Sequence, residues 1–171
     1  MIAIEKIAFG GGCHWCTEAV FQSLLGVHKV EQGFIASIDE NDSLSEAVIV
    51  YFNPKEIELK TLIEIHLYTH KSTSNHSMRT KYRSAIYIFS EEQRRSSIEI
   101  LASFQEVFEN KIITQVLLFK TFNPSPEAFQ DYYQKNPNKP FCEKYIYPKL
   151  NLVTQQFSKR VDPTKSGDIV V

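Results

Sequence analysis

The hydrophobic pattern of the chain begins with alternation and then changes to helical spacing. Residues 2–9 alternate apolar and polar positions as a half-buried strand does, and three glycines, Gly10 to Gly12, follow. From about Trp15, apolar residues recur at helical spacing until Gly26 supplies a stop. The pattern predicts a strand, a glycine junction that allows close backbone approach, and a helix.

Later segments repeat this alternation of strands and helices. Residues 27–37 and 46–52 are typical of an antiparallel strand pair around a polar loop. The further predicted elements are a helix from Asn53-Pro54 to about residue 68, a polar loop 69–81, a strand 84–89, a helix from Glu91 that buries Ile98, Leu101, Phe104 and Phe108, a strand 113–122 and a short helix 127–134. This order predicts an α+β fold, a split βαβ (ferredoxin-like) two-layer sandwich with an additional strand, helices and an irregular C-terminal tail.

Length and charge limit what such a chain can be. With 171 residues and 43% hydrophobic content, we expect a single catalytic domain over residues 1–150 and a partly disordered tail over 151–171. The 19 basic and 20 acidic residues give a net charge of −1, so nucleic acid and anionic membranes are not expected partners. No apolar run suits a membrane span or a signal peptide, so we expect a cytoplasmic protein.

The cysteines are the first candidates for chemistry. Three are too few for a disulfide-stapled scaffold of this length. Cys13 follows the glycines at the predicted start of a helix, where free N–H groups and the helix dipole favour an anion. A thiolate is such an anion, and it is the reactive form of cysteine. We therefore predict that Cys13 is an activated nucleophile rather than a small buried side chain.

The spacing of Cys13 and Cys16 leaves several interpretations open. Cys13-His14-Trp15-Cys16 has the spacing of a thioredoxin-like redox pair. The same two thiolates, with His66 and His70, could instead bind zinc, although no second cysteine pair exists. Cys16 could also be structural and face the inner side of the helix.

Four motifs in chain order resemble one known family. Gly10 to Val27 reads G-G-G-C-H-W-C-T-E-A-V-F-Q-S-L-L-G-V and resembles the G-C-F-W-C/G-x-E signature of peptide methionine sulfoxide reductase A. Ser45-Glu46-Ala47-Val48 stands where that family has His-Ala-Glu-Val. The other matches are Lys81 to Tyr87 with Q-Y-R-S-A-I and Gln130 to Pro137 with Q-D-Y-x-x-K-N-P. The resemblance covers about residues 7–150.

The resemblance implies a reaction and roles for the matching residues. Cys13 would attack the sulfur of methionine-S-sulfoxide, peptide-bound or free, and become a sulfenic acid. Glu46 would protonate the departing oxygen, because a carboxyl group in an apolar pocket retains its proton. Tyr82 would donate a hydrogen bond to the same oxygen, and Trp15 would hold the substrate methyl group.

A second thiol must then release the enzyme from the sulfenic acid. Cys142 follows the Lys-Asn-Pro motif, similar to the position of a recycling cysteine in many relatives, and a tail loop would carry it to Cys13. Cys16 is the alternative, although cysteines one helical turn apart need that turn to distort before a disulfide forms. The resemblance implies no cofactor or metal, only an external dithiol, which by analogy is thioredoxin. We expect a monomer that acts on oxidised proteins or free methionine sulfoxide.

The sequence also departs from the family around the expected substrate. His14 replaces the phenylalanine of the signature, and Phe34 stands where a tyrosine supplies a second hydroxyl. Ser77 falls on an aspartate position, for which His76 could compensate, and Ser45 replaces part of the His-Ala pair. We expect Trp15, His14, Phe34 and Ser77 to line the substrate site. Losing one hydrogen bond to a developing charge costs about 2–4 kcal/mol of barrier, so we expect a slower enzyme rather than an inactive one.

Two other functions compete with this interpretation. A thioredoxin-like disulfide oxidoreductase would use Cys13 and Cys16, but no proline is placed to face that pair. A catalytically silent member of the fold would only bind methionine-like side chains or zinc.

Overall fold

A six-stranded sheet organises the molecule. The computed structural model describes residues 3–165. The sheet order is β5-β4-β1-β3-β2-β6, with strands β1 (Glu5–Gly10), β2 (Val27–Ala36), β3 (Ser45–Phe52), β4 (Ala85–Ile88), β5 (Gln115–Leu118) and β6 (Thr121–Pro124). The four central strands pair antiparallel, which confirms the split βαβ arrangement. β5 is parallel to β4 and β6 is antiparallel to β2.

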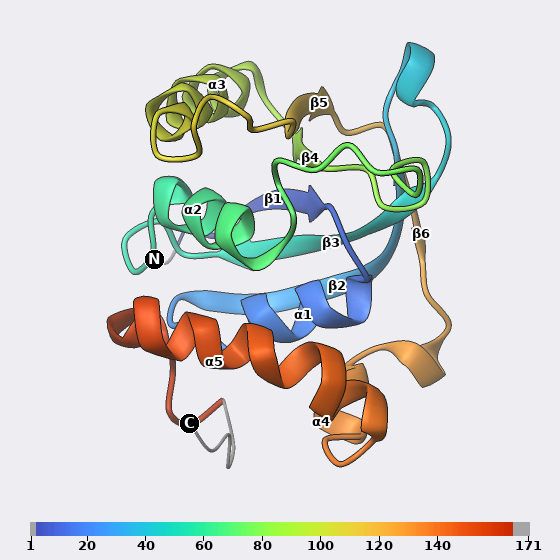
Figure 1. Cartoon of the computed structure of the whole chain (residues 1–171), viewed down its shortest axis with the longest axis vertical. Helices are drawn as coiled ribbons and strands as arrows, with labels where there is room; N and C mark the ends of the chain where they lie inside the picture. Colours follow the sequence, from blue (N-terminus) through green and yellow to red (C-terminus); the bar gives the residue numbers. More distant parts are fainter. Residues whose placement is uncertain (1–2, 166–171) are drawn as a thin grey trace.

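Helices cover one face of this sheet. They are α1 (His14–Gln22), α2 (Leu59–Thr69), α3 (Glu91–Gln105), α4 (Tyr132–Lys135) and α5 (Tyr147–Gln156). Figure 1 shows α1, α2 and α5 in front of the strands, with α3 beyond α2. The main core lies between these layers and includes Phe9, Phe21, Val50, Ile63 and Ile86, all with no more than 1% of their surface exposed. Burial of this apolar surface is the main stabilising term of the fold.

The predicted strand over residues 113–122 is wrong in detail. It is two short strands, β5 and β6, at opposite edges of the sheet. The chain crosses between the edges at Phe119 and Lys120, whose N–H groups donate to Ile88 and Ala36 respectively. Both halves are apolar enough to read as one strand, because a sequence pattern does not show which edge a strand joins. Ile98, expected to be buried on α3, is 43% exposed.

The C-terminal part is more ordered than the sequence indicated. α5 runs to Gln156, with Val153 fully buried, so the expected boundary at residue 150 falls inside a helix. Arg160 accepts a backbone hydrogen bond from Leu25, and Asp162 donates one to Ser23. Disorder was expected within residues 151–171, of which 166–171 lie outside the described residues. Within residues 3–165, no helix combines the length and hydropathy that a bilayer span requires.

Candidate functional site

Three strand ends meet where β1 stops. Gly10, the last residue of β1, pairs with Ala47 near the start of β3 and with Ala85 at the start of β4. A side chain at Gly10 would lie 2.9 Å from the carbonyl oxygen of Arg83 and 3.0 Å from that of Glu46. The glycine is therefore required, as the sequence predicted. Because the ends of these strands meet here, Cys13, Glu46 and Tyr82 come to the same end of the sheet.

Ser45 ties two of these segments together. Its buried hydroxyl donates to the carbonyl of Lys81 at 2.9 Å and accepts from the N–H of Arg83 at 2.8 Å. The N–H of Glu46 also donates to the Lys81 carbonyl, at 3.0 Å. Ser45 therefore fixes the position of Tyr82 relative to Glu46. From the sequence alone, Ser45 was only a departure from the family motif, and no spacing rule indicated this tie.

Cys13 caps the N-terminus of α1, as predicted. The pKa of its thiol is lowered, chiefly by the neighbouring Cys16 side chain acting as a hydrogen-bond donor to the thiolate form. The N–H groups of Trp15 and Cys16 add to this effect, and burial opposes it. The pKa of Cys16 is raised by the same contact, so Cys16 remains a neutral donor. This arrangement stabilises a thiolate on Cys13.

Glu46 is buried, but its neighbours are not the apolar groups that the sequence suggested. One carboxylate oxygen, Oε1, accepts from the N–H of His14 at 3.2 Å and lies 3.4 Å from His14 Nε2. The other, Oε2, lies 3.7 Å from Lys81 Nζ. Lys81 stands at the glutamine of the Q-Y-R-S-A-I motif, and we did not assign it a role from the sequence. Both oxygens of the expected acid therefore face nitrogen atoms.

His14 and Phe34 lie beside Glu46. Phe34 is the direct cross-strand partner of Glu46 in the β2–β3 register. The Phe34 ring meets the His14 ring edge-on, with centroids 5.1 Å apart. His14 Nδ1 lies 2.8 Å from the carbonyl oxygen of Gly33. A tyrosine side chain at position 34 would therefore extend from a backbone position next to Glu46, where the resemblance implies a second hydroxyl.

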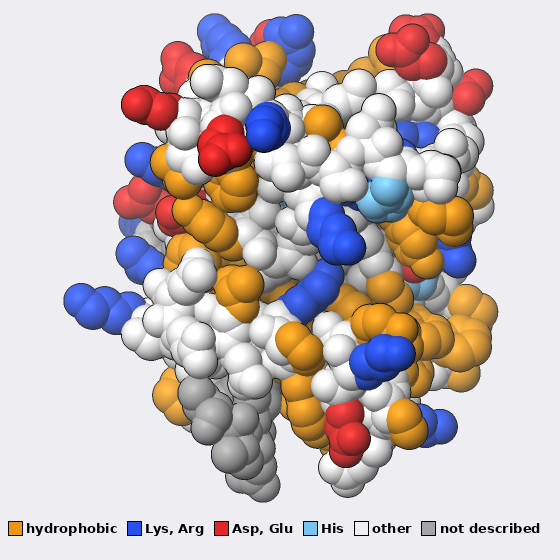
Figure 2. All heavy atoms as spheres, in the orientation of Figure 1, with side chains coloured by type: hydrophobic (Ala, Val, Ile, Leu, Met, Phe, Trp, Pro, Cys, Tyr) orange, Lys and Arg blue, Asp and Glu red, His pale blue; other side chains and the backbone are white. Residues whose placement is uncertain are grey.

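A cavity of about 1030 Å³ opens next to Cys13. It lies between α2, α5 and the loop before β4, and Tyr82 lines it together with Cys13 and Cys16. Its other lining side chains include Lys71, Lys149, His70, His76, Tyr68, Phe141 and Tyr145. Figure 2 shows Lys and Arg side chains in the middle of this face and acidic side chains mainly toward its margins. A thiolate is favoured in such surroundings.

Not all expected substrate residues reach this cavity. Its lining does not include Trp15, His14, Phe34 or Glu46. Ser77 is exposed and does not line it either, whereas His76 does. The fold therefore brings Cys13 and Tyr82 to the cavity, whereas the other expected site residues named above do not line it.

Trp15 belongs to an aromatic cluster. Its ring stacks on Tyr132 at 4.0 Å between centroids and meets Phe141 edge-on at 5.3 Å. Buried Glu18 holds this cluster in place, because its carboxylate accepts from the N–H groups of Asp131 and Tyr132 at 2.9 and 3.1 Å. The Q-D-Y motif is therefore anchored on α1. The sequence reasoning assigned Glu18 no role, although the glutamate of the signature falls on this residue.

Cys142 lies closer to the other cysteines than a tail loop implied. It begins a five-residue π-helical turn, Cys142–Ile146, and packs with Cys16, Ile146 and Leu150, against which Cys13 also packs. Cys142 is fully buried, its thiol donates to the carbonyl of Asn136, and burial raises its pKa. All three cysteines are free thiols. Cys142 is thus a neutral thiol within the same cluster as the nucleophile.

His66 and His70, the candidate zinc ligands, are packed into the protein interior. The rings of His66 and His70 stack at 4.0 Å, and burial lowers the pKa of His70 to about 3. His70 packs against Gly11, whose φ of +154° and close contact leave no room for a side chain. Over residues 3–165, no group of three or more His, Cys, Asp or Glu side chains could hold a metal ion.

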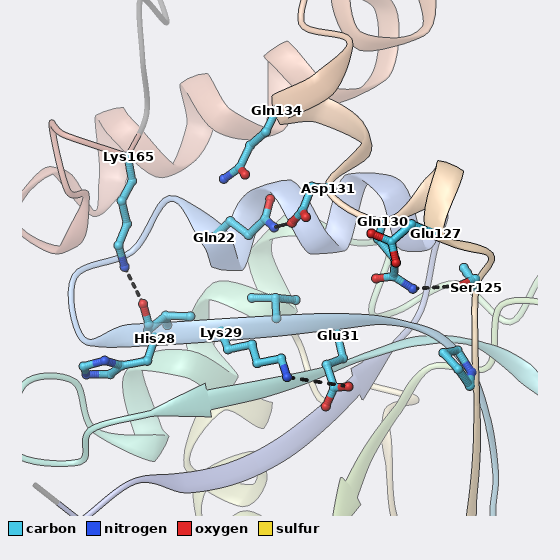
Figure 3. A pocket seen from close by; sticks show the side chains of 13 residues that line it. Gln22, His28, Lys29, Glu31, Ser125, Glu127, Gln130, Asp131, Gln134 and Lys165 are labelled. Carbon is cyan, nitrogen blue, oxygen red and sulfur yellow. Dashed lines mark hydrogen bonds and ion pairs between the residues drawn. The ribbon is translucent and has the colours of Figure 1, made fainter.

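Figure 3 shows another hollow, of about 600 Å³, beside β2. Its polar groups mostly satisfy one another: Gln22 donates to Asp131 at 2.7 Å, and Lys165 donates to backbone carbonyls. It contains neither a cysteine nor any residue of the predicted site. Chemistry is therefore expected at Cys13 and not here.

Comparisons with known proteins identify the family to which the chain belongs. The family model for peptide methionine sulfoxide reductase matches residues 5–161. A relative from Trichodesmium erythraeum, named peptide methionine sulfoxide reductase MsrA, is 33% identical, over 92% of this chain and 98% of its own. The oxidised form of Mxr1 from Saccharomyces cerevisiae is 27% identical with a TM-score of 0.66, over 78% of this chain and 82% of its own. The structure of Mxr1 from the same organism in complex with Trx2 is 24% identical with a TM-score of 0.61, over 75% of this chain and 84% of its own. The chain belongs to the peptide methionine sulfoxide reductase family.

Proposed function

We propose that the protein reduces methionine-S-sulfoxide to methionine, with Cys13 as the nucleophile and thioredoxin as the reductant. The observation that carries this proposal is the position of Cys13 at the start of α1, on a cavity that Tyr82 also lines, together with the lowered pKa of the Cys13 thiol. Family membership supplies the reaction. The complex of Mxr1 with Trx2 supports a thioredoxin-type partner. We expect a monomer that works in the cytoplasm without a cofactor.

The reaction balances with the groups present. The Cys13 thiolate attacks the sulfoxide sulfur and forms a bond to it, and one proton from the enzyme goes to the sulfoxide oxygen. The substrate's S–O bond then breaks, the oxygen passes as a hydroxyl group to the Cys13 sulfur, and the bond between Cys13 and the substrate sulfur breaks to release the thioether. Cys13 is oxidised to a sulfenic acid and the sulfoxide is reduced to the thioether. A neutral thiol then condenses with the sulfenic acid, releasing water and leaving a disulfide. An external dithiol reduces that disulfide.

Cys142 is our candidate for this second thiol. It belongs to the buried cluster against which Cys13 packs, and π-helical turns often occur at functional sites. Cys16 already contacts Cys13, but its disulfide would require the first turn of α1 to open.

An epimer-resolved assay tests the proposal. We expect reduction of the S epimer with dithiothreitol and with thioredoxin, and no reduction of the R epimer, because separate enzymes serve the two epimers. Reduction of insulin disulfides without sulfoxide turnover would instead identify a thioredoxin-like oxidoreductase. No turnover with either reductant would identify a silent member of the fold.

A further inference from the structure

The contact between His14 and Glu46 constrains where protons can be. His14 Nδ1 lies 2.8 Å from the carbonyl oxygen of Gly33, and a carbonyl oxygen only accepts. Nδ1 must therefore carry a hydrogen in every protonation state of this geometry. In neutral His14 this leaves Nε2 as a lone-pair acceptor, and Nε2 faces Glu46 Oε1 at 3.4 Å.

Two acceptors do not face each other favourably in a buried site. The side chains of His14 and Glu46 are 8% and 9% exposed, so water cannot screen the contact well. One proton between Nε2 and Oε1 removes the conflict, whether the pair is imidazole with carboxylic acid or imidazolium with carboxylate.

We propose that His14 and Glu46 hold a single shared proton and that this dyad is the acid that protonates the sulfoxide oxygen. Glu46 delivers the proton, and His14 is a positioning residue that keeps it available. The step rests on the proposed function. It leaves neutral imidazole and a carboxylate, while the oxygen becomes the hydroxyl of the Cys13 sulfenic acid. Solvent restores the proton.

Lys81 opposes the dyad's hold on this proton. Its ammonium lies 3.7 Å from Glu46 Oε2 and favours the carboxylate over the carboxylic acid. It also favours the neutral imidazole, and it is one cause of the lowered pKa of His14, after burial. The charged or titratable groups facing the dyad are Lys81, Cys13 and, through Lys81, Tyr82. The phenylalanine ring at position 34 carries no charge.

The test is the pH profile of the first chemical step. Pre-reduced enzyme reduces methionine-S-sulfoxide in a single turnover without external thiol, so the ionisation of a reductant does not interfere. The alkaline limb reports loss of the shared proton. In His14→Phe, Glu46 holds the proton alone beside Lys81, so we expect this limb to move down by about one pH unit or more. In Lys81→Gln, we expect it to move up.

Shifts of the alkaline limb in opposite directions in the two variants distinguish the shared proton from a mere packing role of His14. His28→Phe, the same substitution at an exposed histidine, should leave the profile unchanged. A His14→Phe profile that drops at every pH without moving its limb would overturn the proposal. So would a Lys81→Gln profile that stays in place. Lys81 is largely exposed, so its variant is expected to fold even if His14→Phe does not.

Nuclear magnetic resonance tests the dyad without sulfoxide. In ¹⁵N-histidine spectra, neutral His14 should be the Nδ1–H tautomer, and Glu46→Gln should lower its pKa because the favourable charge is lost. An Nε2–H tautomer or an unchanged titration would contradict the proposal. If the spectra agree but no sulfoxide is reduced, the dyad stands and the proposed function fails.

Discussion

At the scale of the residue, Cys13 depends on a neighbour that the sequence left ambiguous. Cys16 was open to redox, zinc or structural roles, and in the folded chain its side chain is the largest cause of the lowered pKa of Cys13. Its own raised pKa keeps the proton in place. The sequence predicted the thiolate from the helix N-terminus, but the larger contribution comes from a side chain one turn away, whose direction no spacing rule fixes.

Replacing Cys16 should weaken this thiolate. In Cys16→Ala the sulfur of Cys13 loses its thiol donor, so we expect the pKa of Cys13 to rise. As the pH is lowered, the thiolate should then be protonated, and become unreactive, at a higher pH than in the unmodified protein. Cys16→Ser retains an O–H donor and should change the pKa less. The measurement is the pH dependence of Cys13 alkylation by iodoacetamide in a Cys142→Ser background. Equal midpoints in the alanine and serine variants would contradict the account.

Phe34 offers a gain of function. It pairs with Glu46 across the strands, so a hydroxyl at position 34 can reach the oxygen that Glu46 protonates. We expect Phe34→Tyr to raise the single-turnover rate at least about tenfold, because one added donor to a developing charge has effects of this order or larger. Phe119→Tyr, which stacks on Phe89, is the matched control. An unchanged rate in Phe34→Tyr would show that position 34 does not face the oxygen.

At the scale of the element, most strands and helices follow from the sequence, and their edges do not. The alternation before Gly10 and the helical spacing after it predicted β1 and α1 because one period fits each segment. β5 and β6 were merged because an edge strand depends on its distant partner. The C-terminal helix was missed because Pro148 and mixed polarity hide it, although proline is tolerated in a first helical turn.

Glu18 links α1, β2 and the Q-D-Y segment, and removing it should destabilise all three. It is fully buried and accepts from Asp131, Tyr132 and the side chain of Gln32. Glu18→Ala leaves these donors without a partner, so we expect a loss of about 2–5 kcal/mol in the free energy of unfolding. Glu18→Gln keeps one acceptor and should lose less. Denaturant midpoints measure both, and an unchanged midpoint in Glu18→Ala would refute the anchoring role.

The π-helical turn at Cys142 should matter only for recycling. Cys142→Ser leaves Cys13, Glu46 and Tyr82 in place, so turnover with dithiothreitol should continue. Turnover with thioredoxin should be lost, because no disulfide forms for thioredoxin to reduce. The measurement is the steady-state rate with each reductant, and Cys16→Ser is the comparison variant. Retained thioredoxin activity in Cys142→Ser would transfer the resolving role to Cys16.

At the scale of the whole molecule, the order of the motifs along the chain predicted which residues come together, but it did not predict what surrounds each of them. The ordered motifs contain Cys13, Glu46 and Tyr82, which come to one end of the sheet because β1, β3 and β4 are neighbours in a split βαβ sheet. The surroundings of Glu46 could not be read in this way. His14 and Lys81 approach it from different segments, and only the folded chain sets the distances between them. The expected division at residue 150 stays a prediction, although α5 crosses it.

The most direct test of the account is epimer-resolved reduction of methionine sulfoxide by the wild-type protein and by Cys13→Ser. We predict that the wild type converts the S epimer to methionine with dithiothreitol or thioredoxin and leaves the R epimer unchanged. Cys13→Ser should convert neither, while remaining folded by circular dichroism. Retained S-epimer turnover in Cys13→Ser, or no turnover in the wild type with either reductant, would contradict the central role of the Cys13 thiolate.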